Sequence, residues 1–276
     1  TLIPKKGLAA QREKELEEKL EAYRSSLSEE QLDAMVEKTK ALEAYQEAGE
    51  DPKALECIPM LKRSDIKREA AKIINEELTV DDSLFLYHDV CTNGIGYVDL
   101  MFKTDSIAPE QIPYLGLLKS VLGYVDTEHY TYGELFNEIN ANTGGINCGV
   151  EVFDRADSTE EFQAMFSVRG KALYTKMDFL FKMIGEILNS SKLEDTKRLY
   201  EIVASVKSRA QVNLTGAGHS TAVLRAAAYS SPMAAFQDEM AGIGYYQFIE
   251  KLEKDFEQRK EETVEELCKL MKKILR

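Results

Sequence analysis

The sequence predicts an α+β fold, in which an antiparallel or mixed sheet carries helices on one face and follows a long antiparallel helical hairpin. Strand-like segments are confined to the stretch between about residues 84 and 169, and helical periodicity dominates before and after it. Strands followed by a run of helices are typical of α+β domains, whose helices gather on one side of the sheet. We expect the hairpin linker to occupy residues 1–75 and the α+β domain, with its helical C-terminal part, residues 76–276.

Two narrow apolar stripes predict the helices of the hairpin. Leu16 and Leu20 lie on the first stripe, Leu32 and Met35 lie on the second, and charged residues fill most positions between them. A Ser-x-x-Gln capping box at Ser28 restarts the helix, so we place the turn there. Stripes of this width bury little by themselves, so we expect these side chains to be partly exposed and to need a partner surface.

The connection from the hairpin to the sheet is less regular. Asp51 and Pro52 can cap and start a short third helix. Residues 58–61 are apolar and contain a proline, which favours extended chain. Residues 64–77 fit a helix or a strand equally well.

Periodicity predicts four strands in the domain, with helices between and after them. In the second strand, Ile95, Tyr97 and Asp99 fall on one face. Pro109 opens the first helix of the domain, and Thr131 caps the next one. The expected strands are residues 84–87, 94–102, 146–154 and 161–169, and the expected helices are residues 109–124, 131–142, 173–189, 193–214, 219–229, 232–241, 243–256 and 258–275.

Charge and hydropathy argue against two classes of partner. The formal net charge is −13, and the densest basic run, residues 269–276, is interrupted by Leu, Met and Ile. Nucleic-acid binding needs a clustered basic surface, and a membrane span needs roughly 18 or more consecutive apolar residues. We therefore expect neither a nucleic acid nor a membrane as partner.

The cysteines indicate the compartment. Cys57, Cys91, Cys148 and Cys268 are widely spaced, and none belongs to a C-x-x-C pair. Such spacing in a long chain is typical of reduced thiols, so we expect a cytoplasmic protein. The chain begins at Thr1 inside a helical pattern, as an excised piece or a processed fragment would.

No catalytic or metal-binding residue emerges from spacing alone. His88, His129 and His219 are far apart, whereas a zinc motif such as H-x-x-E-H needs two histidines about one helical turn apart. His88 and Asp89 beside Cys91 suggest a dyad, but a nucleophilic thiol needs a base close in space and a neighbour that lowers its pKa. We interpret the histidines as surface or structural residues and Cys91 as a buried or half-buried thiol.

Two glycine-containing turns also fall short of a phosphate-binding loop. Residues 143–146 and 214–218 lack the strand, glycine-rich loop and helix sequence with Lys-Ser/Thr that such a loop requires. The residue patterns alone therefore predict an α+β domain with a helical arm and no cofactor-binding site.

Several motifs between residues 58 and 146 carry a family resemblance. They are Ile58-Pro59, His88 to Leu100 with its Thr92-Asn93-Gly94-Ile95 core, Ile112-Pro113-Tyr114-Leu115, Tyr130 to Leu135, and Thr143-Gly144-Gly145-Ile146. In this order, and after an acidic helical hairpin, they resemble the linker and third domain of presequence proteases, a branch of the pitrilysin/insulinase zinc peptidases. The resemblance covers nearly the whole chain.

The resemblance implies a pitrilysin-like domain without its chemistry. The family closes two bowl-like halves around an unfolded peptide, and the zinc ligands and general-base Glu come from an H-x-x-E-H helix of the first domain. On the corresponding helix of this chain, Tyr114, Leu117 and Leu118 stand at the His, Glu and His positions. Tyr and Leu can neither hold zinc nor activate water in that way.

The function implied is a non-catalytic middle fragment of a zinc-dependent oligopeptide-degrading metalloendopeptidase. It would form part of the peptide-enclosing chamber and the hinge between the halves, and zinc would be bound by a missing domain of the parent enzyme. Its partners would be the remaining domains of the same polypeptide and the unfolded peptide substrate. The alternative is a stand-alone protein-interaction or scaffold module with a helical arm, and the neighbouring reading frame distinguishes the two.

Overall fold

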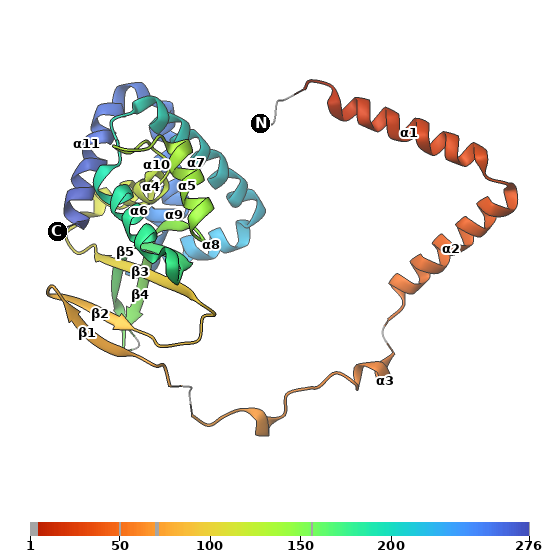
Figure 1. Ribbon diagram of the computed structural model, residues 1–276, viewed down its shortest axis with the longest axis horizontal. Helices are drawn as coiled ribbons and strands as arrows, with labels where there is room; N and C mark the ends of the chain where they lie inside the picture. The colour runs from red at the N-terminus through yellow and green to blue at the C-terminus, as the bar shows by residue number, and fades with distance from the viewer. Residues whose placement is uncertain (1–4, 50, 70–71, 156, 276) are drawn as a thin grey trace. The chain divides into compact units, whose positions relative to one another are not determined.

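The structure is a computed structural model that describes residues 5–49, 51–69, 72–155 and 157–275. Contacts within the chain divide it into two units, Thr1–Ile73 and Ile74–Arg276. The first unit contains helices, and the described strands all lie in the second, together with further helices (Figure 1). The predicted α+β class is therefore confirmed. No described helix combines the length and the apolar character needed to cross a membrane.

Helix caps in the first unit form where the sequence predicts them. The Ser28 hydroxyl accepts a hydrogen bond from the Gln31 backbone N–H at 3.3 Å, and the Gln31 side chain accepts from the Ser28 N–H at 3.0 Å. The Asp51 carboxylate accepts from the Lys53 N–H at 3.0 Å. The helices of this unit are α1 (Leu8–Ser26), α2 (Glu29–Glu47), α3 (Pro52–Leu55) and the 3₁₀ turn η1 (Arg63–Asp65).

The antiparallel hairpin predicted for α1 and α2 is not formed. No residue of either helix is buried, and α1 and α2 are not packed along their length within the described part of this unit. Leu16 and Leu20 each keep 57% of their surface exposed, which confirms the predicted exposure of the stripes. Each stripe is about one side chain wide, so the area the pair could bury does not offset the entropy lost on docking.

The connection to the second unit contains a strand that the sequence did not reveal. Residues 58–61 lie outside regular structure, as expected, and β1 (Glu76–Val80) begins inside the ambiguous stretch. Ala70 and Ala71 of that stretch lie outside the described residues. β1 pairs antiparallel with β2 (Ser83–Tyr87), the predicted first strand. The turn residues Asp81 and Asp82 both have positive φ, 47° and 64°, as a tight two-residue hairpin requires.

A second sheet of three antiparallel strands supports the rest of the domain. β3 (Ile95–Lys103), β4 (Ile146–Arg155) and β5 (Ser158–Leu173) are arranged in the order β3-β5-β4. Tyr97 and Asp99 are exposed on β3, whereas Phe166 and Val168 of the central strand are fully buried. One face of this sheet is therefore covered, and the other is open. Ala156, in the turn between β4 and β5, lies outside the described residues.

Helices lie together on one side of the three-stranded sheet (Figure 1). The predicted helices are confirmed, with one correction: the helix expected from residue 173 begins at 177, because β5 extends to Leu173 and a 3₁₀ turn follows, η3 (Tyr174–Lys176). The helices are α4 (Ile112–Val121), preceded by η2 (Pro109–Gln111), α5 (Tyr132–Asn142), α6 (Met177–Ser190), α7 (Thr196–Gly216), α8 (Gly218–Ala227), α9 (Pro232–Ala241), α10 (Ile243–Lys254) and α11 (Phe256–Ile274).

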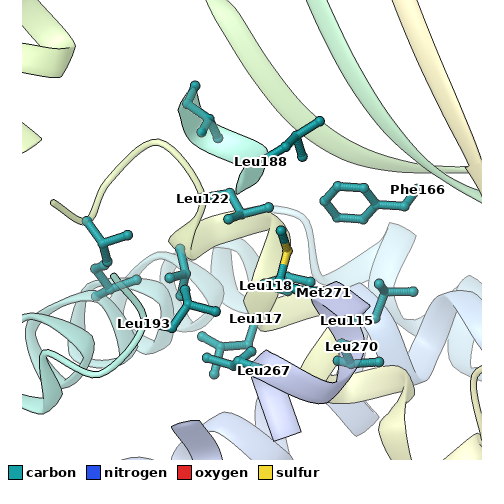
Figure 2. Packing of buried hydrophobic residues seen from close by; sticks show 14 of the residues in the cluster. Leu115, Leu117, Leu118, Leu122, Phe166, Leu188, Leu193, Leu267, Leu270 and Met271 are labelled. Carbon is teal, nitrogen blue, oxygen red and sulfur yellow. The ribbon is translucent and has the colours of Figure 1, made fainter. Parts of the chain in front are cut away.

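Helix α4 lies at the centre of the hydrophobic core. Figure 2 shows Leu115, Leu117 and Leu118 of this helix beside residues of α11, among them Leu267 and Leu270. All five of these side chains are fully buried. A helix that is apolar around most of its circumference must be enclosed by other elements. The packing of this domain is therefore organised around α4.

Candidate functional site

The helix that aligns with the family's zinc motif is α4, and its motif positions are core positions. Tyr114, Leu117 and Leu118 are exposed by only 6%, 0% and 0%. The Tyr114 hydroxyl accepts a hydrogen bond of 2.8 Å from Arg259 of α11, and burial raises the pKa of Tyr114. Apolar side chains and an arginine-bound phenol do not fit a zinc ion, whose protein ligands are Cys, His, Asp and Glu.

The third motif position has a specific packing role. A Cβ at Gly116 would lie 2.6 Å from the Met240 carbonyl oxygen and 2.8 Å from Cε2 of Tyr245. The end of α9 and the start of α10 therefore approach the α4 backbone at a point where only glycine fits. This close approach replaces catalytic chemistry with helix packing.

The three histidines are dispersed, as the sequence predicts. Nδ1 of His88 lies 2.7 Å from the Ile74 carbonyl oxygen. Nδ1 of His129 lies 3.0 Å from a Glu186 carboxylate oxygen, and the His129 N–H donates to the same carboxylate at 3.2 Å. His219 lies in the first turn of α8. Within the described ranges, no three His, Cys, Asp or Glu side chains gather closely enough to hold a metal ion.

The cysteines show no sign of nucleophilic activation. Cys91 is exposed, not buried or half-buried as expected, because it lies in the loop after β2, which no other described element covers. Its Sγ is 3.7 Å from the Asn93 side-chain oxygen, while the His88 ring is engaged by Ile74, so no dyad is formed. Burial raises the pKa of Cys148 to about 12, which keeps this thiol protonated.

Two cavities at the C-terminal end of α4 are the features that sequence reasoning missed. Their volumes are about 270 and 460 Å³, and Lys119, Ser120 and Arg209 line both. One signal was present in the sequence: Lys119 and Ser120 interrupt an otherwise apolar helix. The participation of Arg209 depends on how α7 packs against α4, which no local pattern reveals.

The open face of the three-stranded sheet carries an ion-pair cluster. Arg169 of β5 contacts Asp99 of β3 at 2.7 Å and Glu151 of β4 at 3.1 Å, so it links all three strands. Its neighbours on this face include Tyr97 and Phe153, which are 63% and 44% exposed. The face is thus partly apolar, and the described helices leave it uncovered.

Comparison with known proteins adds family membership to this geometry. The family described as peptidase M16, subfamily C, associated matches residues 2–252. Protein HypA of Clostridium perfringens is 34% identical over 275 residues, covering 100% of this chain and 28% of HypA. Presequence protease 1, chloroplastic/mitochondrial, of Arabidopsis thaliana is 29% identical over 244 residues, covering 88% of this chain and 22% of that protein.

A third relative agrees with these two. The mitochondrial presequence protease of Yarrowia lipolytica is 28% identical over 235 residues, covering 85% of this chain and 23% of that protein. The chain thus spans about a quarter of the length of these curated relatives. The resemblance to the presequence-protease branch is confirmed, and the chain belongs to the associated family of subfamily C of these peptidases.

Proposed function

We propose that this chain is the non-catalytic middle portion of a zinc-dependent oligopeptide-degrading metalloendopeptidase. The observation that carries the proposal is α4: at the position of the family's zinc motif it contributes buried Tyr114, Leu117 and Leu118 to the core. The domain keeps the helix but uses it for packing. Zinc and the general base would therefore come from another domain of the same polypeptide.

The same proposal gives the two units different roles. The open sheet face, with exposed Tyr97 and Phe153, is free to form part of the wall of a peptide-enclosing chamber. Helices α1 and α2 bury no residue of their own, so they are suited to a hinge whose apolar stripes contact the two halves of the enzyme. Relatives about four times as long as the chain support partners within the same polypeptide.

The decisive experiment uses the complete reading frame. We expect it to encode H-x-x-E-H upstream, and replacement of that Glu by Gln should abolish hydrolysis of a fluorogenic peptide by the full-length protein. The 276-residue chain alone should show neither chelator-sensitive hydrolysis nor stoichiometric zinc. A frame without the upstream motif, or chelator-sensitive hydrolysis by the isolated chain, would contradict the proposal.

The chamber role has its own test. In the inactive full-length variant, an unfolded peptide with a photoreactive group should label the open sheet face near Tyr97. Labelling should fall when an unlabelled substrate peptide competes. Labelling confined to other domains would remove the chamber wall from the proposal and leave the hinge.

A second candidate is a stand-alone interaction module whose helical arm clasps a partner. The complete exposure of α1 favours it, since an arm of this kind needs an uncovered surface. This candidate predicts a reading frame that starts near residue 1 and a partner that protects α1 from proteolysis.

The cytoplasmic location expected from the cysteines also stands as a proposal. All four thiols are free in the structure, which suits a reducing compartment. Several relatives carry mitochondrial or chloroplastic in their names, and such organelles also have reducing interiors. Subcellular fractionation with an antibody against this chain decides between the two.

A further inference from the structure

The two cavities at the C-terminal end of α4 form one feature with a shared rim. The smaller cavity, about 270 Å³, lies among α4, α7, α9 and α10, and the larger, about 460 Å³, lies among α4, α5, α7 and β4. Lys119, Ser120 and Arg209 line both of them. The larger cavity falls within the size range of small-molecule sites.

Two cations on this rim have no carboxylate partner. Lys119 is half-buried and Arg209 is exposed, and no carboxylate of the described residues lies within 4.0 Å of either charged group. Elsewhere on α7 the situation differs, because Lys207 contacts Glu253 at 2.8 Å. Burial lowers the pKa of Lys119, so its charged form is under-compensated.

The carboxylate best placed to compensate Lys119 is already engaged. Glu151 lines the larger cavity and raises the pKa of Lys119 through its charge, but from beyond ion-pair distance. Its carboxylate instead contacts Arg169 at 3.1 Å on the open face of the sheet. In a chain with net charge −13, two cations left uncompensated beside a cavity point to an external anion.

A hydroxyl at the same place is also unsatisfied. Tyr245 is 6% exposed and lines the smaller cavity, and its buried hydroxyl has no hydrogen-bond partner among the described residues. The neighbouring Ser120 hydroxyl donates to the Gly116 carbonyl at 3.4 Å. The polar groups around these cavities therefore offer an excess of donors.

We propose that this cavity pair is a binding site for a small oxyanion, a phosphate or carboxylate group, held by Lys119 and Arg209. Ammonium and guanidinium groups are donors only, so their complement is an acceptor with several oxygens and negative charge. The negative end of the α4 dipole accounts for a cation in its last turn, but not for a second cation on α7 or for the cavities between them. The site is independent of the proposed peptidase role.

Calorimetric titration of the 276-residue chain with inorganic phosphate and with succinate, at constant ionic strength, tests the site. We expect saturable binding of at least one oxyanion, weakened about tenfold in Lys119→Gln and in Arg209→Gln, since each removes one charge-assisted contact. Lys197→Gln is the matched control, because it removes an exposed charge from α7 away from the cavities. The relative affinities of phosphate and succinate identify which oxyanion the site prefers.

A measurement on the unaltered chain guards against variants that fail to fold. Saturating oxyanion should slow chemical acetylation of Lys119 several-fold and leave that of Lys197 unchanged, as followed by peptide mass spectrometry. Absence of saturable binding for both oxyanions, or equal weakening in Lys197→Gln, overturns the proposal. Equal protection of both lysines does so as well, because it would reflect general ionic screening.

Discussion

At the residue scale, two buried tyrosines beside α4 differ in how their hydroxyl groups are compensated. The Tyr114 hydroxyl accepts from Arg259 at 2.8 Å, whereas the Tyr245 hydroxyl is buried with no partner among the described residues. Burial raises the pKa of both phenols, so both are neutral over the ordinary pH range. The two side chains therefore form a natural pair for measuring the value of a buried hydrogen bond.

Removing the two hydroxyl groups should have opposite effects on stability. A buried polar group without a partner costs about 1–3 kcal/mol, while a formed hydrogen bond contributes about 1 kcal/mol. Tyr245→Phe should leave the free energy of unfolding unchanged or raise it by about 1 kcal/mol, and Tyr114→Phe should lower it by about that amount. Urea unfolding of both variants checks this, and a loss in Tyr245→Phe as large as in Tyr114→Phe would mean that the Tyr245 hydroxyl is bonded.

The Glu186 carboxylate should make stability depend on acid pH. Its side chain is only 9% exposed, and although burial alone would raise its pKa, hydrogen bonds from Thr127 and His129 bring it below the ordinary value of 4.5. A carboxyl whose folded pKa is depressed stabilises the fold above its unfolded pKa and loses that contribution as pH falls through the folded pKa.

The expected result is a steeper loss of stability in the wild-type chain than in Glu186→Gln as pH falls from about 5 to 3. Urea unfolding at several pH values measures the two slopes. Asp126 also lies on this loop, so Asp126→Asn serves as a comparison for the loss of a nearby charge. Parallel curves for wild type and Glu186→Gln would show that Glu186 gains nothing from its hydrogen bonds.

At the scale of elements, the packing of α4 against α9 and α10 depends on Gly116. A methyl group at this position would meet the Met240 carbonyl oxygen at 2.6 Å, a backbone atom that cannot rotate away. Gly133 on α5 provides the opposite case, since nothing lies within 4 Å of a Cβ there. The same substitution at the two sites should therefore separate packing from helix propensity.

Gly116→Ala should lower the free energy of unfolding by about 1–3 kcal/mol, the usual cost of overpacking a core. Gly133→Ala should raise it by up to about 1 kcal/mol, since alanine is the better helix former. Thermal unfolding followed by circular dichroism measures both. A similar gain in both variants would show that α9 and α10 move aside without cost.

The same elements show what the sequence could and could not predict. Helices such as α9 and strands such as β3 follow from periodicity and caps, because their burial repeats with the period of the element. β1 and the C-terminal extension of β5 escaped, because their pairing is set by a neighbouring strand and not by their own pattern. The degenerate motif on α4 was found through family resemblance, whereas the cavity at Lys119 and Arg209 needed the packing of three helices.

At the scale of the whole chain, the two units differ in how far they stabilise themselves. Unit Ile74–Arg276 contains a continuous core around α4, from Tyr114 to Ile274. Unit Thr1–Ile73 has no buried residue in α1, α2 or α3, and isolated helices of this length are marginal in water. The first unit therefore lacks the tertiary contacts that would protect its backbone from opening.

Limited proteolysis should expose this difference. In the 276-residue chain, trypsin should cleave first within α1 and α2, which are rich in exposed Lys and Arg, and should leave a resistant fragment beginning near Ile74. In the full-length protein the same helices should be protected, because the stripes at Leu16 and Met35 would then contact other domains. Mass spectrometry of timed digests identifies the cuts, and Leu16→Lys in the full-length protein should restore cleavage. Equal resistance of both units in the isolated chain would mean that α1 and α2 are stabilised without a partner, and the hinge role would lose its physical basis.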